Sequence, residues 1–125
     1  NGATSASGSA VFANASGQLG TIASSIRYKE NVKNMNEEST PILELRPVTF
    51  TYKADALHEK QFGLIAEEVN KIMPALVIRN ANGEIETVKY HELTTLLLNE
   101  LIKQHAIIKE LQITVNDLKK IIEEA

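Results

Sequence analysis

The chain contains no cysteine among its 125 residues. This absence excludes a disulfide framework and any metal site built on thiolates. The three histidines, at positions 58, 91 and 105, are far apart and do not form a recognisable metal-ligand spacing. We therefore expect neither a bound metal nor another cofactor.

The chain also has only a small excess of one sign of charge and no long apolar run. A net charge of −3 provides no general basic surface for nucleic acid or an anionic membrane. No apolar run is long enough to span a bilayer, and the first residues lack the basic start and apolar centre of a signal peptide. We expect a soluble, cytoplasm-compatible protein without nucleic-acid or membrane partners.

Residues 1–23 carry no charged side chain, so all 13 Lys and Arg and all 16 Asp and Glu lie beyond Ala23. Such a stretch buries too little apolar surface to fold by itself. Two interpretations remain open: a flexible linker or remnant, and the last turns of a repetitive β-structured fibre that orders when several chains wrap together. Weak alternation at residues 10–13 and 19–22 is compatible with short strands.

Residues 24–90 predict a small mixed α+β domain. Short helices are expected over residues 28–35, from Thr40-Pro41 onward, and over residues 66–72, the last ended by Pro74. A strand is expected over residues 48–53, where β-branched and aromatic residues alternate with polar ones.

A β-hairpin is expected further along the same domain. Residues 75–79 and 84–88 have strand character and flank the dipeptide Asn82-Gly83. Asn-Gly is a strong hairpin signal because both residues accept a positive φ.

Residues 91–125 predict a coiled-coil helix. Apolar residues recur at alternating spacings of four and three, without Gly or Pro, and one polar residue interrupts them. The predicted seam consists of Leu97, Leu101, Gln104, Ile108, Leu111, Val115, Leu118 and Ile122. A domain the size of residues 24–90 offers too little surface to cover a helix that can reach about 50 Å, so this helix should project and self-associate.

The number of strands in the coiled coil is not settled by the seam residues. A polar seam residue such as Gln104 typically fixes register or strand number. Ile and Val at one seam position with Leu at the other favour a dimer. The residues alone therefore predict an oligomer but not its number of chains.

The sequence contains no Gly-rich phosphate loop, no Ser-His-Asp order and no metal motif. The remaining chemistry is Ser24 with Lys29. A serine hydroxyl needs a base to become a nucleophile, and a lysine serves as one when burial or a neighbouring cation, here Arg27, favours its neutral form. This spacing is a weak signal alone, but it falls at the boundary between the uncharged stretch and the charged domain.

Several ordered blocks resemble a known family. They are Ser24-Ser25-x-Arg27-x-Lys29, Leu45-Arg46-Pro47-Val48, Gly63-Leu64-Ile65-Ala66-Glu67-Glu68-Val69, Val88-x-Tyr90 and the heptad tail. Together they resemble the intramolecular chaperone auto-processing domain, or endosialidase-type self-cleaving peptidase domain. This family ends bacteriophage tailspikes, tail fibres, neck appendages and endosialidases, and it recurs in myelin regulatory factors. The resemblance covers Ser24 to about Leu118, and the Gly-Gln-Leu-Gly lead-in favours a phage fibre.

The resemblance implies a homotrimer with a C-terminal coiled coil, which holds three chains in register while the upstream fibre segment of the same polypeptide winds. It also implies release by a Ser-Lys dyad, mapped onto Ser24 and Lys29 with Arg27 supporting, and a cut between Ser24 and Ser25. The family usually has Asp after the serine, so Ser25 is a departure that adds a second hydroxyl. The implied setting is the host cytoplasm during virion assembly, with the fibre kept in the virion and the domain released.

The predicted organisation is thus a fibre end or linker at 1–23, an auto-processing domain at 24–90 and a coiled-coil helix at 91–125. A permanent, non-cleaving trimerisation module and a receptor-binding fibre tip remain alternatives. The scissile bond is open too. Attack by Ser24 on its own carbonyl needs a strained four-membered ring, whereas attack on the carbonyl of Ala23 would cut before Ser24.

Overall fold

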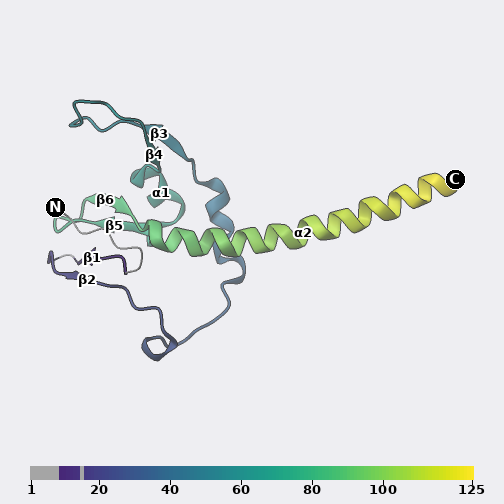
Figure 1. Ribbon diagram of the computed structural model, residues 1–125, viewed down its shortest axis with the longest axis horizontal. Helices are drawn as coiled ribbons and strands as arrows, with labels where there is room; N and C mark the ends of the chain where they lie inside the picture. The colour runs from purple at the N-terminus through teal and green to yellow at the C-terminus, as the bar shows by residue number, and fades with distance from the viewer. Residues whose placement is uncertain (1–8, 15) are drawn as a thin grey trace.

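The computed structural model describes residues 9–14 and 16–125. A small α+β body surrounds the start of one long helix, α2 (Tyr90–Glu124), whose C-terminal half projects alone (Figure 1). The predicted fold class, short hairpins and helices followed by a long C-terminal helix, is confirmed. The part of the predicted fibre end at residues 1–8 and 15 lies outside the described residues.

The uncharged N-terminal stretch forms a minimal antiparallel pair. Strand β1 (Phe12–Ala13) lies beside β2 (Leu19–Gly20), with Phe12 opposite Gly20. The Oδ1 of Asn14 accepts hydrogen bonds from the backbone N–H groups of Ser16 and Gln18, at 2.9 and 3.0 Å. The strands therefore occur where the weak alternation was noted.

A second antiparallel pair joins β3 (Val48–Phe50) to β4 (Gln61–Gly63), and the sequence did not predict β4. The predicted strand over 48–53 ends at Phe50. This residue lies opposite Gln61, the first residue of β4. Gly63 lies in a crowded position, because an added Cβ would lie 3.0 Å from Tyr90 Oη and 3.2 Å from the ring of Phe50.

The predicted hairpin is present as β5 (Val77–Arg79) and β6 (Ile85–Val88). Its turn differs from the expected one: Gly83 takes a positive φ of 80°, but Asn82 does not. Instead the Oδ1 of Asn80 accepts the backbone N–H groups of Asn82 and Glu84, which closes the turn without a second left-handed residue. Residues 75 and 76 belong to the 3-10 turn η3 (Pro74–Leu76), not to the strand.

Helix α1 (Ala66–Ile72) occurs as predicted, but the two earlier helix predictions need correction. No helix covers residues 28–35: a 3-10 turn, η1 (Ile26–Tyr28), ends at the extended Lys29, and Asn31 takes a positive φ of 55°. Asparagine side chains compete for backbone partners and favour such turns. The second helix is a 3-10 helix, η2 (Asn36–Glu44), which starts before the predicted Thr40 and holds Pro41 in its interior.

The hydrophobic core lies where η2, α1 and the β5–β6 hairpin meet the first turns of α2. Its buried residues are Ile42, Val69, Leu76, Val88 and Leu96. Half-buried side chains such as Met35 and Leu93 pack around them. The core ends well before the midpoint of α2, which explains why the second half of that helix projects.

A buried polar cluster holds η2 against α2 just beyond the core. Ser39 is fully buried and Glu100 is 4% exposed. Glu100 Oε1 accepts hydrogen bonds from Ser39 Oγ at 3.1 Å and from Lys103 Nζ at 2.9 Å. Asn99 Nδ2 donates to the carbonyl of Asn36 and to Ser39 Oγ, at 2.9 and 2.7 Å. Each buried polar group is thereby paired, which stabilises the contact between η2 and α2.

Candidate functional site: a serine–lysine pair and an uncovered helix

The chain reverses direction at η1, and this turn creates the candidate site. Ser25 caps η1, with its Oγ accepting the backbone N–H of Arg27 at 3.5 Å. The N–H groups of Tyr28 and Lys29 donate to the carbonyls of Ser25 and Ile26, at 3.0 and 3.1 Å. Two successive 3-10 bonds bring Lys29 back toward the residue that precedes the cap.

Lys29 Nζ lies 3.0 Å from Ser24 Oγ, so the structure brings the two predicted catalytic residues into hydrogen-bond contact. As an ammonium, Lys29 donates to the hydroxyl. As a neutral amine it would accept the hydroxyl proton, which is the arrangement that makes a serine nucleophilic. The two adjacent hydroxyls therefore differ: Ser24 faces the base, whereas Ser25 caps the turn.

The predicted supporting residue Arg27 lies over the ring of Tyr28, 4.7 Å from its centroid. This cation–π contact orients the guanidinium along the outer side of η1. The positive charge stays within two residues of Lys29 in the chain, but its described contact is with the aromatic ring.

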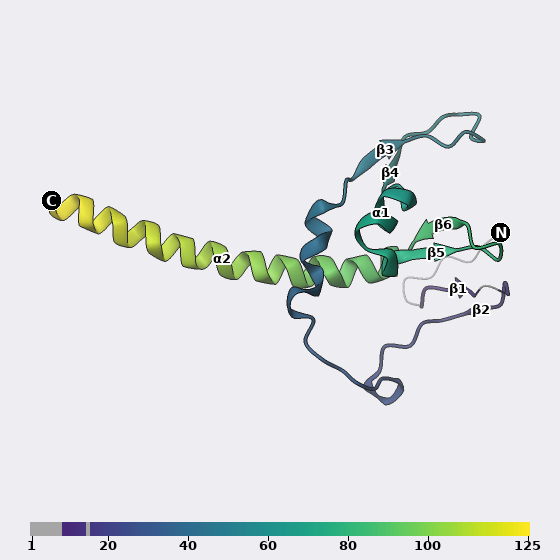
Figure 2. The same ribbon diagram turned by 180° about the vertical axis from the view of Figure 1, so that it is seen from behind.

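The site is open to solvent. Residues 16–34 are all exposed, and η1 has no buried residue. In Figures 1 and 2, the segment between β2 and η2 extends on the opposite side of α2 from the β3–β4 hairpin. Over residues 9–14 and 16–125, no other part of the chain buries this segment.

The predicted seam is also uncovered. Its seven apolar residues are between 46% (Val115) and 72% (Ile122) exposed. Gln104 is half-buried, and its Nε2 donates to Glu100 Oε2 at 3.3 Å. The polar seam residue is therefore linked to the buried cluster that fixes η2. A row of this many exposed large apolar side chains on one helix is typical of an interaction surface.

The sequence reading missed the cluster around Glu100. The signal that could have predicted this cluster is Glu100 itself, a charged residue one turn after Leu96 on the same face of the helix as the core. Another missed feature is the pairing of Arg46 with Glu68, at 3.0 and 2.7 Å, which joins two of the motif blocks. The hydrogen bonds from Arg46 lower the pKa of the Glu68 carboxyl. Arg46 is exposed and Glu68 is only half-buried, so this pair fixes geometry more than it stabilises.

Within residues 9–14 and 16–125, no helix combines the length and apolarity that crossing a membrane requires. Over the same described residues, no group of three or more His, Asp or Glu side chains could hold a metal ion.

Comparison with known families identifies the domain. Residues 24–78 match the family described as chaperone of endosialidase, Peptidase_S74. This segment is similar to the endosialidase-type intramolecular chaperone domains. The match begins at Ser24 and ends in β5, so it contains the serine–lysine pair, both motif blocks joined by Arg46 and Glu68, and most of the core. No curated protein matches the chain.

The match supports a chaperone role, and the family name describes a peptidase. Ser24, the serine of the serine–lysine pair, is the first residue of the matched segment. Helix α2, the predicted coiled-coil segment, lies beyond the matched segment, so its role rests on its own geometry.

Proposed function

We propose that this chaperone domain trimerises, templates the folding of an upstream bacteriophage fibre segment of the same polypeptide, and then releases itself by autoproteolysis at Ser24-Ser25. The single observation that carries the proposal is the 3.0 Å contact of Lys29 Nζ with Ser24 Oγ at the first residue of the family match. The activity is a single-turnover serine endopeptidase reaction that needs no cofactor. It takes place in the host cytoplasm during virion assembly, and the fibre remains in the virion.

The exposed seam supports the trimerisation step. Burying seven large apolar side chains per chain removes the surface that α2 now shows to water. Three chains joined through α2 raise the effective concentration of their upstream strands and reduce the entropic cost of winding them together. Removing the template after winding leaves a fibre whose stability is kinetic.

The chemistry begins when the neutral amine of Lys29 takes the proton of Ser24 Oγ. The alkoxide attacks a carbonyl carbon, a C–O bond forms, the C–N bond of that peptide breaks, and the Lys29 ammonium returns the proton to the leaving amine. Water then hydrolyses the ester and frees the hydroxyl. Within one chain, a five-membered ring directs Ser24 to the carbonyl of Ala23. A cut between Ser24 and Ser25 requires a hydroxyl from Ser25 or from a neighbouring chain.

Mass spectrometry of the purified chain tests the proposal. The expected product is a C-terminal fragment beginning at Ser25, and a fragment beginning at Ser24 identifies attack on Ala23. Ser24→Ala and Lys29→Ala should each leave the chain intact. Lys33→Ala is the matched control, because Lys33 is an exposed lysine of the same loop, and it should cleave like the parent. A parent chain that stays whole at every concentration would contradict autoproteolysis.

The exposure of the dyad favours one alternative, a permanent trimerisation or receptor-binding tip that never cleaves. That function predicts that Ser24→Ala changes neither the fragment pattern nor fibre assembly, and that the domain persists on the mature particle. The Ser25→Ala variant separates the two hydroxyls: if Ser25 is the nucleophile, its loss and not that of Ser24 stops the reaction.

A further inference from the structure

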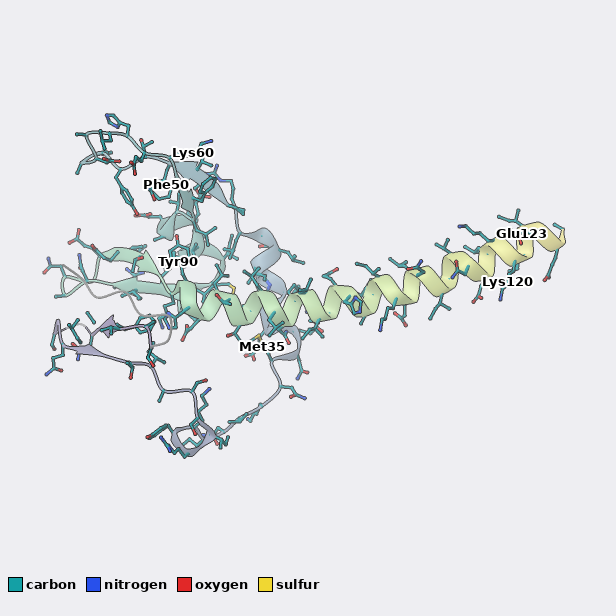
Figure 3. The ribbon with its side chains drawn as sticks, in the orientation of Figure 1. Met35, Phe50, Lys60, Tyr90, Lys120 and Glu123 are labelled. Atoms are coloured by element: carbon teal, nitrogen blue, oxygen red, sulfur yellow. The ribbon has the colours of Figure 1, made fainter. Side chains whose placement is uncertain are left out.

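An open apolar groove of about 470 Å³ lies beside the first turns of α2. One wall comes from η2 and β3, the other from the end of β4, and the floor is α2; its residues include Ile42, Val48, Phe62, Tyr90, Leu93 and Leu97. Figure 3 shows Tyr90 at the base of α2, below the hairpin that carries Phe50. Phe62 is 78% exposed, so the groove holds apolar surface that the described residues leave uncovered.

The groove is continuous with the predicted coiled-coil seam. Leu97 belongs to both, as a groove-lining residue and as the first seam residue. Tyr90 lies seven residues earlier, at the equivalent heptad position, and also lines the groove. A second helix packed along the seam would therefore arrive at the mouth of this groove.

The residues on the two sides of the seam differ in exposure, and this difference favours one occupant of the groove. At about 100° per residue, Leu93 lies on one side of Leu97 and Leu98 on the other. Leu93 is half-buried against the chain's own domain and also lines the open groove, whereas Leu98 is 56% exposed. With Leu97 at a d position, Leu93 occupies g and Leu98 occupies e. In a parallel, in-register coiled coil, a g residue faces the e residue five positions later on the neighbouring helix.

We propose that this groove receives Leu98 of a second copy of the chain. Each chain inserts Leu98 beside Leu93 of one neighbour and receives Leu98 from the other, so the contact closes as a ring. The inference rests on the proposed trimer and adds a domain-to-helix contact to the seam. It makes the chaperone domain itself part of the interface, so that the seam does not hold the trimer alone.

Cross-linking tests the contact directly, because the chain has no cysteine of its own. In a Ser24→Ala background that keeps the chain whole, Thr49→Cys supplies a groove thiol and Leu98→Cys supplies the inserted one. Thr49 is exposed and lines the groove. A short bismaleimide should link two and three chains on a denaturing gel. The control pairs Thr49→Cys with Ile113→Cys, since Ile113 is 60% exposed but lies at the outer f position, and it should give no links.

A substitution pair provides the second measurement. Leu98→Glu places a charge in an apolar groove and should raise the trimer dissociation constant at least about tenfold, whereas Ile113→Glu should change it by less than about twofold. Sedimentation of the parent chain separates the possible failures. A trimer with no cross-links and equal effects of the two variants overturns the groove contact but leaves the proposed function standing. A monomeric parent overturns both.

Discussion

Lys29 Nζ lies 3.0 Å from Ser24 Oγ, yet both side chains are exposed in the single chain. The geometry for proton transfer is thus present before the surroundings that would make the amine a base. A neighbouring chain that covers η1 would supply those surroundings and would couple chemistry to assembly.

Autoproteolysis should therefore depend on assembly. Leu111→Asp breaks the seam far from the dyad and should slow cleavage at least about tenfold, because an isolated chain keeps its lysine hydrated. Fragment yield against protein concentration is the measurement. Ile113→Asp is the matched control and should cleave at the parental rate. Equal cleavage by both variants and no dependence on concentration would show that one chain suffices.

The polar cluster between η2 and α2 should contribute measurably to stability. Ser39→Ala removes a partner of both Glu100 and Asn99 inside a buried site, and it should cost about 1–3 kcal/mol in the free energy of unfolding. Urea denaturation followed by circular dichroism measures this cost. Thr114→Ala, on the exposed half of α2, should change stability by less than about 0.5 kcal/mol. Equal effects would contradict the role given to the cluster.

The same cluster should make stability depend on pH. The hydrogen bond from Lys103 holds the pKa of Glu100 below its ordinary value of 4.5, and the partner bond raises the pKa of Lys103 above 10.5. A lowered carboxyl pKa stabilises the fold above the unfolded value, and this contribution disappears as pH falls from 4.5 through the lowered pKa. A raised lysine pKa acts at the other end, and its contribution disappears as pH rises above 10.5.

Thermal unfolding of the parent and of Glu100→Gln across acidic pH measures this linkage. The difference between their midpoints should be full near neutral pH and should shrink as pH falls below 4.5. Glu110→Gln, at an exposed helix position, controls for the general effect of removing a carboxylate. A difference that stays constant through the acid range would show that Glu100 does not titrate with folding.

A side chain at Gly63 should destabilise the fold. An added Cβ would lie 3.0 Å from Tyr90 Oη and 3.2 Å from the Phe50 ring, so Gly63→Ala should cost about 1–3 kcal/mol through forced displacement of these groups. Chemical denaturation measures the loss. Gly20→Ala is the control, because its Cβ would meet nothing within 4 Å. Adding Tyr90→Phe to Gly63→Ala should recover part of the cost, and additive losses would indicate another cause.

The local sequence pattern determined the elements that periodicity or turn residues mark within a few positions. The heptad spacing in α2, the amphipathic α1 ended by Pro74, and the Asn-Gly turn of β5–β6 all lie where the sequence places them, because periodicity and turn chemistry act over a few residues. The expected helix over residues 28–35 failed for the converse reason. Its asparagines favour turns, and no apolar face there has a surface to pack on.

Tertiary structure decided what depends on residues distant in sequence. Strand β4 exists because β3 pairs with it, and Glu100 is buried because Ser39, 61 residues earlier, reaches it. Sequence alone determined the family resemblance and the heptad spacing of the predicted seam, and it offered the pairing of Ser24 with Lys29 as a hypothesis. Only the fold decided that the 3-10 turn of η1 closes this pair and that the groove beside Leu93 stays open, since both are set by how separate elements meet in space.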